Sequence, residues 1–233
     1  MRRLIASTTT LIALFVAAPA FAGVSEVGDF ADAPFPTASC PTDCNAIAKV
    51  TGYQTRVTTH NDPMMLHHSG KIVAFTIKLG KPDADQTTFF QRLFGQRSQA
   101  RVSVLRRGDK RQARLIGQSQ LFDLNRYFGS TATFVLDTPL KVPLARKGTS
   151  IVLALTVPTW APAFAVNLGR DHSWRSSRKP TACNDVGQPA VQDVMRSIRT
   201  YGCFYRTARL LYSVSFVPTQ KETNPDPKPR AVR

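Results

Sequence analysis

The chain has 233 residues, and its 31 Lys and Arg against 15 Asp and Glu give a formal net charge of +16. A hydrophobic share of 42% excludes a fully disordered chain, and a charged share of 20% excludes a membrane protein with several spans. The length is ordinary for one β-rich domain, which at this size folds without a metal or a dense disulfide scaffold.

Residues 1–22 have the features of a secretory signal peptide. The chain starts with the basic pair Arg2-Arg3, residues 11–22 are apolar, and a small-x-small cleavage box ends at Ala22. The alternative is an uncleaved signal anchor, which the well-formed box argues against. The sequence has no second apolar stretch long enough to span a bilayer, so we expect no integral membrane segment after cleavage. The expected location is therefore secreted, either extracellular or in the cell envelope.

Beyond the cleavage site the chain divides into three parts. Residues 23–36 are acidic, contain prolines and lack periodicity, so we expect a flexible N-terminal segment. Residues 37–218 hold the periodic apolar runs and are expected to form one β-sandwich domain. Residues 219–233 combine prolines with charges and are expected to be a disordered tail.

The four cysteines indicate two disulfides in an exported protein. Three pairings are formally open, and we favour Cys40–Cys44 with Cys183–Cys203, because each pair closes a segment rich in turn-forming residues. The alternative is a four-cysteine zinc site. Zinc ribbons and fingers need two to four residues inside both pairs, which the second pair does not provide, and export leads to an oxidising compartment.

Strand patterns fill most of the chain between residues 46 and 217. In residues 71–79 the positions Val73, Phe75, Ile77 and Leu79 form an apolar face, which predicts a strand with that face toward the core. The predicted strands are residues 46–58, 71–79, 100–106, 112–117, 132–137, 149–157, 164–168 and 206–217. Antiparallel strands with long connections and no βαβ alternation predict an all-β protein, an antiparallel β-sandwich resembling a jelly roll. Residues 86–95 and 121–129 have helical spacing and predict two short helical turns.

A histidine-rich loop follows the first predicted strand. His60 and Asp62 lie close to His67 and His68, and imidazole with carboxylate suits a borderline metal ion. An Asn-Asp-Pro turn signal interrupts this group, so the alternative is an ordinary loop between strands. We treat the four residues as a weak metal candidate and expect no cofactor.

Basic residues concentrate between Arg92 and Arg114. This segment contains eight of them and a single acid, Asp109. Alternation along residues 100–106 puts Arg101 and Arg107 opposite the apolar positions, and Lys110 falls in the hairpin turn. Such a field attracts polyanions, so these three residues are candidates for binding an anionic surface polymer. The alternative is a solvated face without function. We expect no nucleic-acid partner, because the protein is exported and carries no nucleic-acid motif.

Aromatic residues near the predicted sandwich ends give a second set of candidates. Trp160, Trp174, Arg175 and Tyr201 could present flat rings and a guanidinium to a carbohydrate. The alternative, strongest for Trp160, is that the rings fill the end of the core.

No catalytic motif stands out: there is no Gly-x-Ser-x-Gly elbow, phosphate-binding glycine loop or zinc-protease histidine pair. We therefore predict a secreted, non-catalytic module that binds a glycan or an anionic cell-envelope polymer. One alternative is a structural or protein-interaction protein of the cell envelope. A second is a secreted hydrolase with an unrecognised site.

Overall fold

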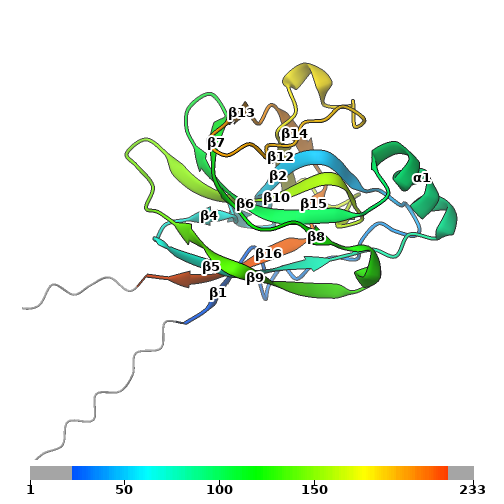
Figure 1. Ribbon diagram of the computed structural model, residues 1–233, viewed down its shortest axis with the longest axis horizontal. Coiled ribbons are helices and arrows are strands. Elements are labelled where there is room, and N and C mark those ends of the chain that lie inside the picture. Colours follow the sequence, from blue (N-terminus) through cyan, green and yellow to red (C-terminus); the bar gives the residue numbers. More distant parts are fainter. Residues whose placement is uncertain (1–22, 220–233) are drawn as a thin grey trace, which may run out of the picture.

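The computed structural model describes residues 23–219, which form antiparallel sheets and one α-helix (Figure 1). The first sheet has the order β1 (Ser25–Val27), β16 (Tyr212–Pro218), β5 (Gly70–Lys78) and β9 (Thr131–Val142). The second follows the path β13 (Ile198–Thr200), β7 (Gln112–Gln118), β6 (Gln99–Arg107), β10 (Ser150–Ala161), β2 (Ile47–Val57), β12 (His172–Ser176) and β14 (Cys203–Arg206). Three short strands join it, β3 (His60–Asn61), β4 (Met65–Leu66) and β8 (Phe122–Asp123), while β11 (Phe164–Ala165) pairs with β15 (Arg209–Leu210).

Eight of these strands have the topology of a jelly roll. Along the chain, β1, β2, β5, β6, β7, β9, β10 and β16 give two four-stranded sheets, ordered β1-β16-β5-β9 and β2-β10-β6-β7. Only the β6–β7 hairpin stays in one sheet, and every other connection crosses between the two. This is the double Greek key of a jelly roll, so the predicted all-β antiparallel sandwich is confirmed.

The core lies between the two jelly-roll sheets. Phe75 and Ile77 of β5 are fully buried, as their alternation predicts, and Phe75 stacks on Phe134 of β9 with ring centroids 5.3 Å apart. Ile72 is also fully buried, whereas Val73 is only half-buried. The β5–β9 register shifts between Ile72 and Ala74, and such a bulge reverses which side chains point inward.

A long insertion joins β10 to β16 and covers the outer face of the second sheet. Its strands β12 and β14 extend that sheet beyond β2, and β13 pairs with β7 at the opposite edge (Figure 1). Both predicted disulfides are formed, and Cys183–Cys203 lies within this insertion. The strands β12, β13 and β14 were not predicted, because strands of three to five residues carry too few alternating positions to be recognised.

The helix α1 (Ala84–Phe94) begins two residues before the predicted one. Asp83 is its N-cap, and Asp83 and Gln86 form a reciprocal capping box that fixes the first turn. The second predicted helical turn, within residues 121–129, is present as the 3₁₀ turn Asn125–Tyr127, and the short strand β8 precedes it.

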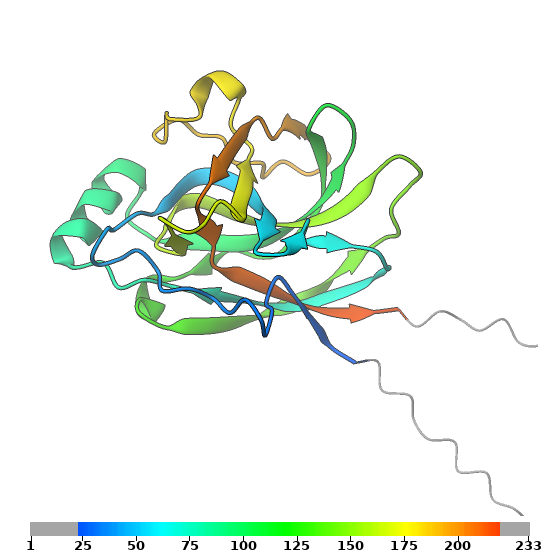
Figure 2. The same cartoon turned by 180° about the vertical axis from the view of Figure 1, so that it is seen from behind.

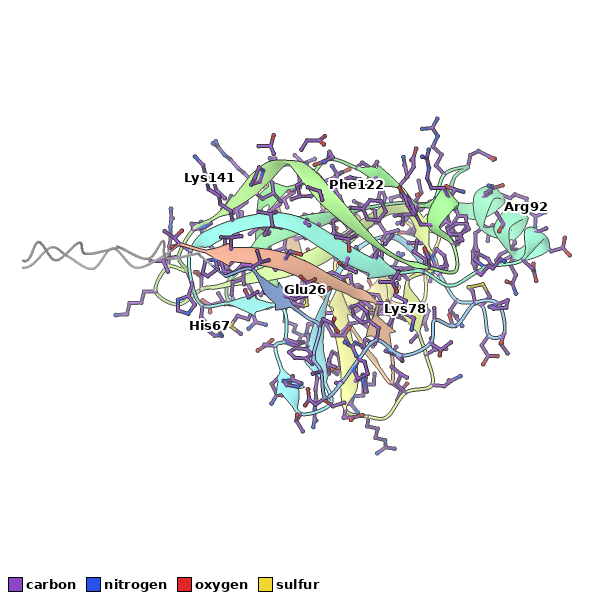
Figure 3. All side chains as sticks on the ribbon, turned by 90° about the horizontal axis from the view of Figure 1, so that it is seen from below. Glu26, His67, Lys78, Arg92, Phe122 and Lys141 are labelled. Atoms are coloured by element: carbon purple, nitrogen blue, oxygen red, sulfur yellow. A yellow bond between two sulfur atoms is a disulfide. The ribbon has the colours of Figure 1, made fainter. Side chains whose placement is uncertain are left out.

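The N-terminal segment is part of the fold, which corrects the expected boundary at residue 37. β1 pairs with β16, and Glu26 accepts hydrogen bonds from the hydroxyls of Ser213 and Ser215 (Figures 2 and 3). Phe30 stacks on His60 at 3.9 Å between ring centroids. Tertiary contacts that no local pattern reveals therefore hold residues expected to be flexible.

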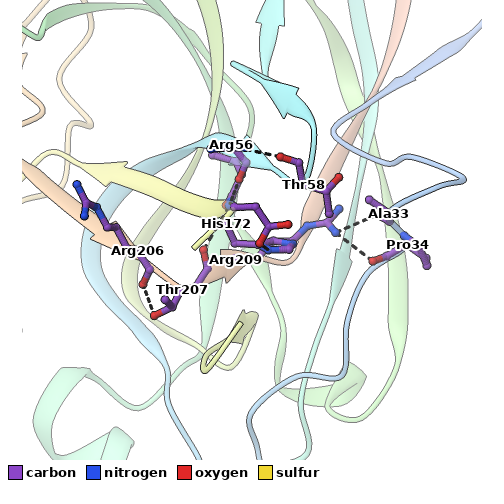
Figure 4. A network of polar contacts seen from close by, with 11 residues as sticks. Ala33, Pro34, Arg56, Thr58, His172, Arg206, Thr207 and Arg209 are labelled. Carbon is purple, nitrogen blue, oxygen red and sulfur yellow. Dashed lines mark hydrogen bonds and ion pairs between the residues drawn. The ribbon is translucent and has the colours of Figure 1, made fainter. Parts of the chain in front are cut away.

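Arg209 ties this segment to the insertion. Its buried guanidinium donates to the carbonyls of Ala33, Pro34 and Gly28 at 2.9, 3.0 and 3.2 Å (Figure 4). Burial lowers the pKa of Arg209 to about 10, against the smaller opposing effect of Asp29.

The predicted signal peptide, residues 1–22, lies outside the described residues, and so does the predicted tail beyond Thr219. Within residues 23–219, no helix has the length and apolar character that crossing a membrane requires.

Replacing Arg209 by Met should lower the free energy of unfolding by about 2–3 kcal/mol, because three buried carbonyls lose a charged donor. Chemical denaturation measures this. Arg206→Met is the control, because Arg206 lies three residues away and is exposed. Equal stability of the two variants would contradict a structural role for Arg209.

Candidate functional site

Trp160 lies in the core. The side chain has no exposed surface, and the indole nitrogen donates to the carbonyl of Gly95 at 3.0 Å. Its ring packs against Phe90 of α1 and Phe128, with centroids 5.1 and 5.4 Å away. Trp160 therefore fixes the helix to β10 and offers no ring face to a ligand, as the core-filling alternative predicted.

Trp174 and Tyr201 are buried as well. Trp174 is 6% exposed and stacks on Tyr205 with centroids 4.5 Å apart, while its indole nitrogen has no hydrogen-bond partner. Tyr201 is fully buried and donates to the side-chain carbonyl of Gln192 at 2.9 Å. Burial raises the pKa of the Tyr201 hydroxyl well above its ordinary value. These rings hold the insertion in place, so they too are unavailable for stacking on a surface ligand.

Arg175 reaches the surface beside a ring that was not among the candidates. Its guanidinium lies over the ring of Phe204 at 4.8 Å, and Phe204 is 42% exposed. Arg206 lies 5.7 Å from the same ring. Burial lowers the pKa of Arg175, and the like charges of Arg111 and Arg107 lower it further. The one exposed aromatic ring of this region is thus already in contact with two cations.

The structure separates the residues of the weak metal candidate. His60 contacts Asp32 at 3.0 Å, Asp62 pairs with Arg107 at 2.8 Å, and His67 and His68 are exposed. Among residues 23–219, no three His, Cys, Asp or Glu side chains gather where they could hold a metal ion.

The three basic candidates do not form one exposed patch. Arg101 and Arg107 share the outer side of β6 with Ser103, but they lie at opposite ends of the strand. Burial lowers the pKa of Arg101, and the charge of Asp193 partly offsets this. Arg107 is neutralised by Asp62 and also donates to Ser150. Of the three, only Lys110 is a free, exposed cation in the hairpin turn.

An uncompensated basic pair lies on the other side of the same hairpin. Arg106 of β6 and Arg114 of β7 are directly opposite each other in the strand register. Like charges in such cross-strand positions destabilise a sheet. The Arg106 Nε atom is buried without a partner, and desolvation with the charges of Arg146 and Arg114 lowers the pKa of Arg106. We call Arg106, Arg114 and Arg146 the arginine cluster.

The arginine cluster borders a series of hollows. One of 290 Å³ is lined by three cations, one acid and Ile198; the cations are Arg106, Lys110 and Arg114, and the acid is Asp109. Ile198 also lines a neighbouring hollow of 420 Å³, whose cations are Lys179 and Arg199 and whose acid is Asp193. A third, of 260 Å³, shares Ser177, Lys179 and Arg199 with the second. Because neighbouring hollows share lining residues, they form one track around β13, which we call the basic track.

Within residues 23–219, no cation that lines the basic track forms an ion pair with a carboxylate. Of the Lys and Arg side chains in residues 23–219, two form ion pairs, Arg97 with Asp123 and Arg107 with Asp62, and neither lines the track. Hairpin alternation could have identified Arg106 and Arg114 as a second set of basic residues. The strand β13, which completes the track, had no recognisable signal.

Comparison of the chain with protein-family models, with curated proteins and with solved structures finds no match. The function must therefore be argued from the geometry of the site.

Replacing Arg107 by Gln should lower the free energy of unfolding by about 1 kcal/mol, because Asp62 and Ser150 lose a half-buried partner. Lys110→Gln should leave stability unchanged, because Lys110 is exposed and forms none of the ion pairs in residues 23–219. Thermal denaturation of both variants checks this, and an unchanged Arg107 variant would show that the ion pair contributes nothing.

Proposed function

We propose that the protein is an exported, non-catalytic module that binds an anionic polymer of the cell envelope along the basic track. The observation that carries the proposal is the Arg106–Arg114 cross-strand pair. Two guanidinium groups side by side are unfavourable in the free protein, and a bound polyanion would relieve that repulsion. A solvated basic face without function would not need this arrangement.

Guanidinium chemistry favours an anion over a neutral glycan. Arg forms bidentate hydrogen bonds with carboxylate, phosphate and sulfate groups, which a neutral sugar lacks. The rings that would stack on a neutral sugar, Trp160, Trp174 and Tyr201, are buried. Among glycans, these observations therefore favour an acidic glycan as the partner and not a neutral one.

The disulfides support export. All four cysteines are in disulfide bonds, and such bonds persist in oxidising compartments. An envelope polymer would meet the protein in that location.

Replacing Arg106, Arg114 and Arg146 together by Gln should weaken binding to a polyanion such as heparin by about tenfold. Three ionic contacts of about 0.5 kcal/mol each, two from exposed side chains and one from the half-buried Arg106, give that change. Binding of the parent should weaken steeply as salt rises. A heparin column and titration calorimetry at two salt concentrations measure both effects.

The matched control replaces Arg92, Arg126 and Arg170 by Gln. These residues are exposed and lie outside the basic track, so the net charge falls equally. Figure 3 shows Arg92 on the helix α1, at one end of the molecule. If both triple variants lose affinity equally, binding follows net charge and the arginine cluster is no specific site.

A further inference from the structure

A turn with an apolar surface lies in the middle of the basic track. Residues 194–197 form it, and the amide of Ser197 donates to the carbonyl of Val194 at 3.1 Å. Val194, Met195 and Ile198 are 67%, 46% and 51% exposed. Three neighbouring large apolar side chains at this exposure are costly in water and commonly mark an interaction site. We call residues 194–198 the apolar turn.

The apolar turn is held rigidly against the edge of the sheet. Arg196 and Leu115 are joined by an amide-to-carbonyl bond of 2.9 Å, and the Leu115 amide donates to Ser197 at 3.1 Å. The buried side chain of Gln192 donates to the carbonyl of Ser197 at 2.9 Å, and Arg114 donates to that of Arg196 at 2.7 Å. These bonds fix the backbone, so the apolar side chains cannot turn inward to escape water.

Cations surround the apolar turn on both sides. Ile198 shares one hollow with Arg106, Lys110 and Arg114, against the single acid Asp109. Val194 and Ile198 share the next one with Lys179 and Arg199, against the single acid Asp193. The two hollows together therefore hold five cations and two acids. An apolar centre within a basic ring differs from what a hydrated polysaccharide needs, because such a polymer offers no apolar phase. It matches a bilayer surface, where side chains enter the boundary of the acyl chains and basic residues contact anionic headgroups.

We propose that this face docks on an anionic lipid bilayer, with Val194, Met195 and Ile198 entering the interface and the arginine cluster contacting lipid phosphates. The inference rests on the basic track of the proposed function and adds a lipid surface as its partner. An anionic polymer would contact the basic residues alone, whereas a bilayer would contact the apolar turn as well.

The helix α1 supplies an internal control. Phe89 and Leu93 are 48% and 45% exposed, close to the values in the apolar turn. The hollow beside Phe89 is lined by one cation, Arg92, and one acid, Asp85, so no basic ring surrounds it. The whole length of β6 separates α1 from the β6–β7 hairpin (Figure 1).

The test is cosedimentation of residues 23–233 with two kinds of vesicle. The neutral vesicles contain phosphatidylcholine alone, and in the anionic vesicles about one third of the lipid is phosphatidylglycerol. The parent should bind the anionic vesicles and not the neutral ones. The variant Val194→Ser, Met195→Ser, Ile198→Ser should lose vesicle affinity by about tenfold or more and keep the parent's affinity for heparin. The control variant Phe89→Ser, Leu93→Ser should bind both as the parent does.

A second variant reports insertion directly. In Met195→Trp, addition of anionic vesicles should shift the indole emission to the blue, because Trp160 and Trp174 are buried and give a constant background. Heparin should produce no such shift.

Three results would overturn the inference. Vesicle binding by the triple serine variant equal to that of the parent would show electrostatic attachment without insertion. Heparin binding by the parent without vesicle binding would refute the lipid partner and leave the polymer proposal standing. Failure of the parent to bind either probe would refute both proposals.

Discussion

The outer face of the second jelly-roll sheet carries hydroxyl groups that must be both covered and hydrogen-bonded. Ser103, Thr156 and Thr51 lie in a row across β6, β10 and β2, with oxygen–oxygen distances of 2.7 and 3.0 Å. The insertion extends this row, because the backbone N–H of Gln192 donates to the Thr51 hydroxyl at 3.0 Å. A buried hydroxyl without a partner would cost more than the bond contributes, so the row favours a placement of the insertion that supplies this bond. That placement lays residues 193–200 along β7, which creates both the basic track and the apolar turn.

The same side-chain type performs three different tasks in this protein. Arg178 and Arg209 are buried and donate to backbone carbonyls, four in the case of Arg178, so they hold segments that lack regular strands. Arg107 is neutralised by Asp62. Arg106 and Arg114 face each other without an acid. A net charge of +16 therefore overstates the electrostatic field of the surface, and the unpaired groups, more than the total, indicate where a polyanion would bind.

The jelly roll could be predicted because its strands are long enough to show a period. Residues 71–79 alternate over nine positions, residues 149–157 are apolar on both faces as a central strand is, and both disulfides follow from local spacing. The insertion could not, because β13 and β14 depend on tertiary contacts and the Cys183–Cys203 bond for their position. The same limit affected the basic hairpin. Alternation separates Arg101 and Arg107 from Arg106 and Arg114, yet it cannot say which set the insertion will cover, because both faces of this sheet are buried.

The core and the surface proposed for binding are thus built from different side chains. The apolar layers between the two sheets supply the core, where Phe75, Phe134 and Phe122 pack against one another. The insertion has its own restraints: the Cys183–Cys203 bond, the carbonyl contacts of Arg178, and the Tyr205 hydroxyl, which donates to Cys183. The edge of β7 is paired separately, with β13 and with residues 196–197. The exposed side chains of the apolar turn therefore do not pack in the core. Under the proposed function, the ligand would constrain their identity more than the fold does, which would account for a like-charge pair and three exposed apolar side chains there.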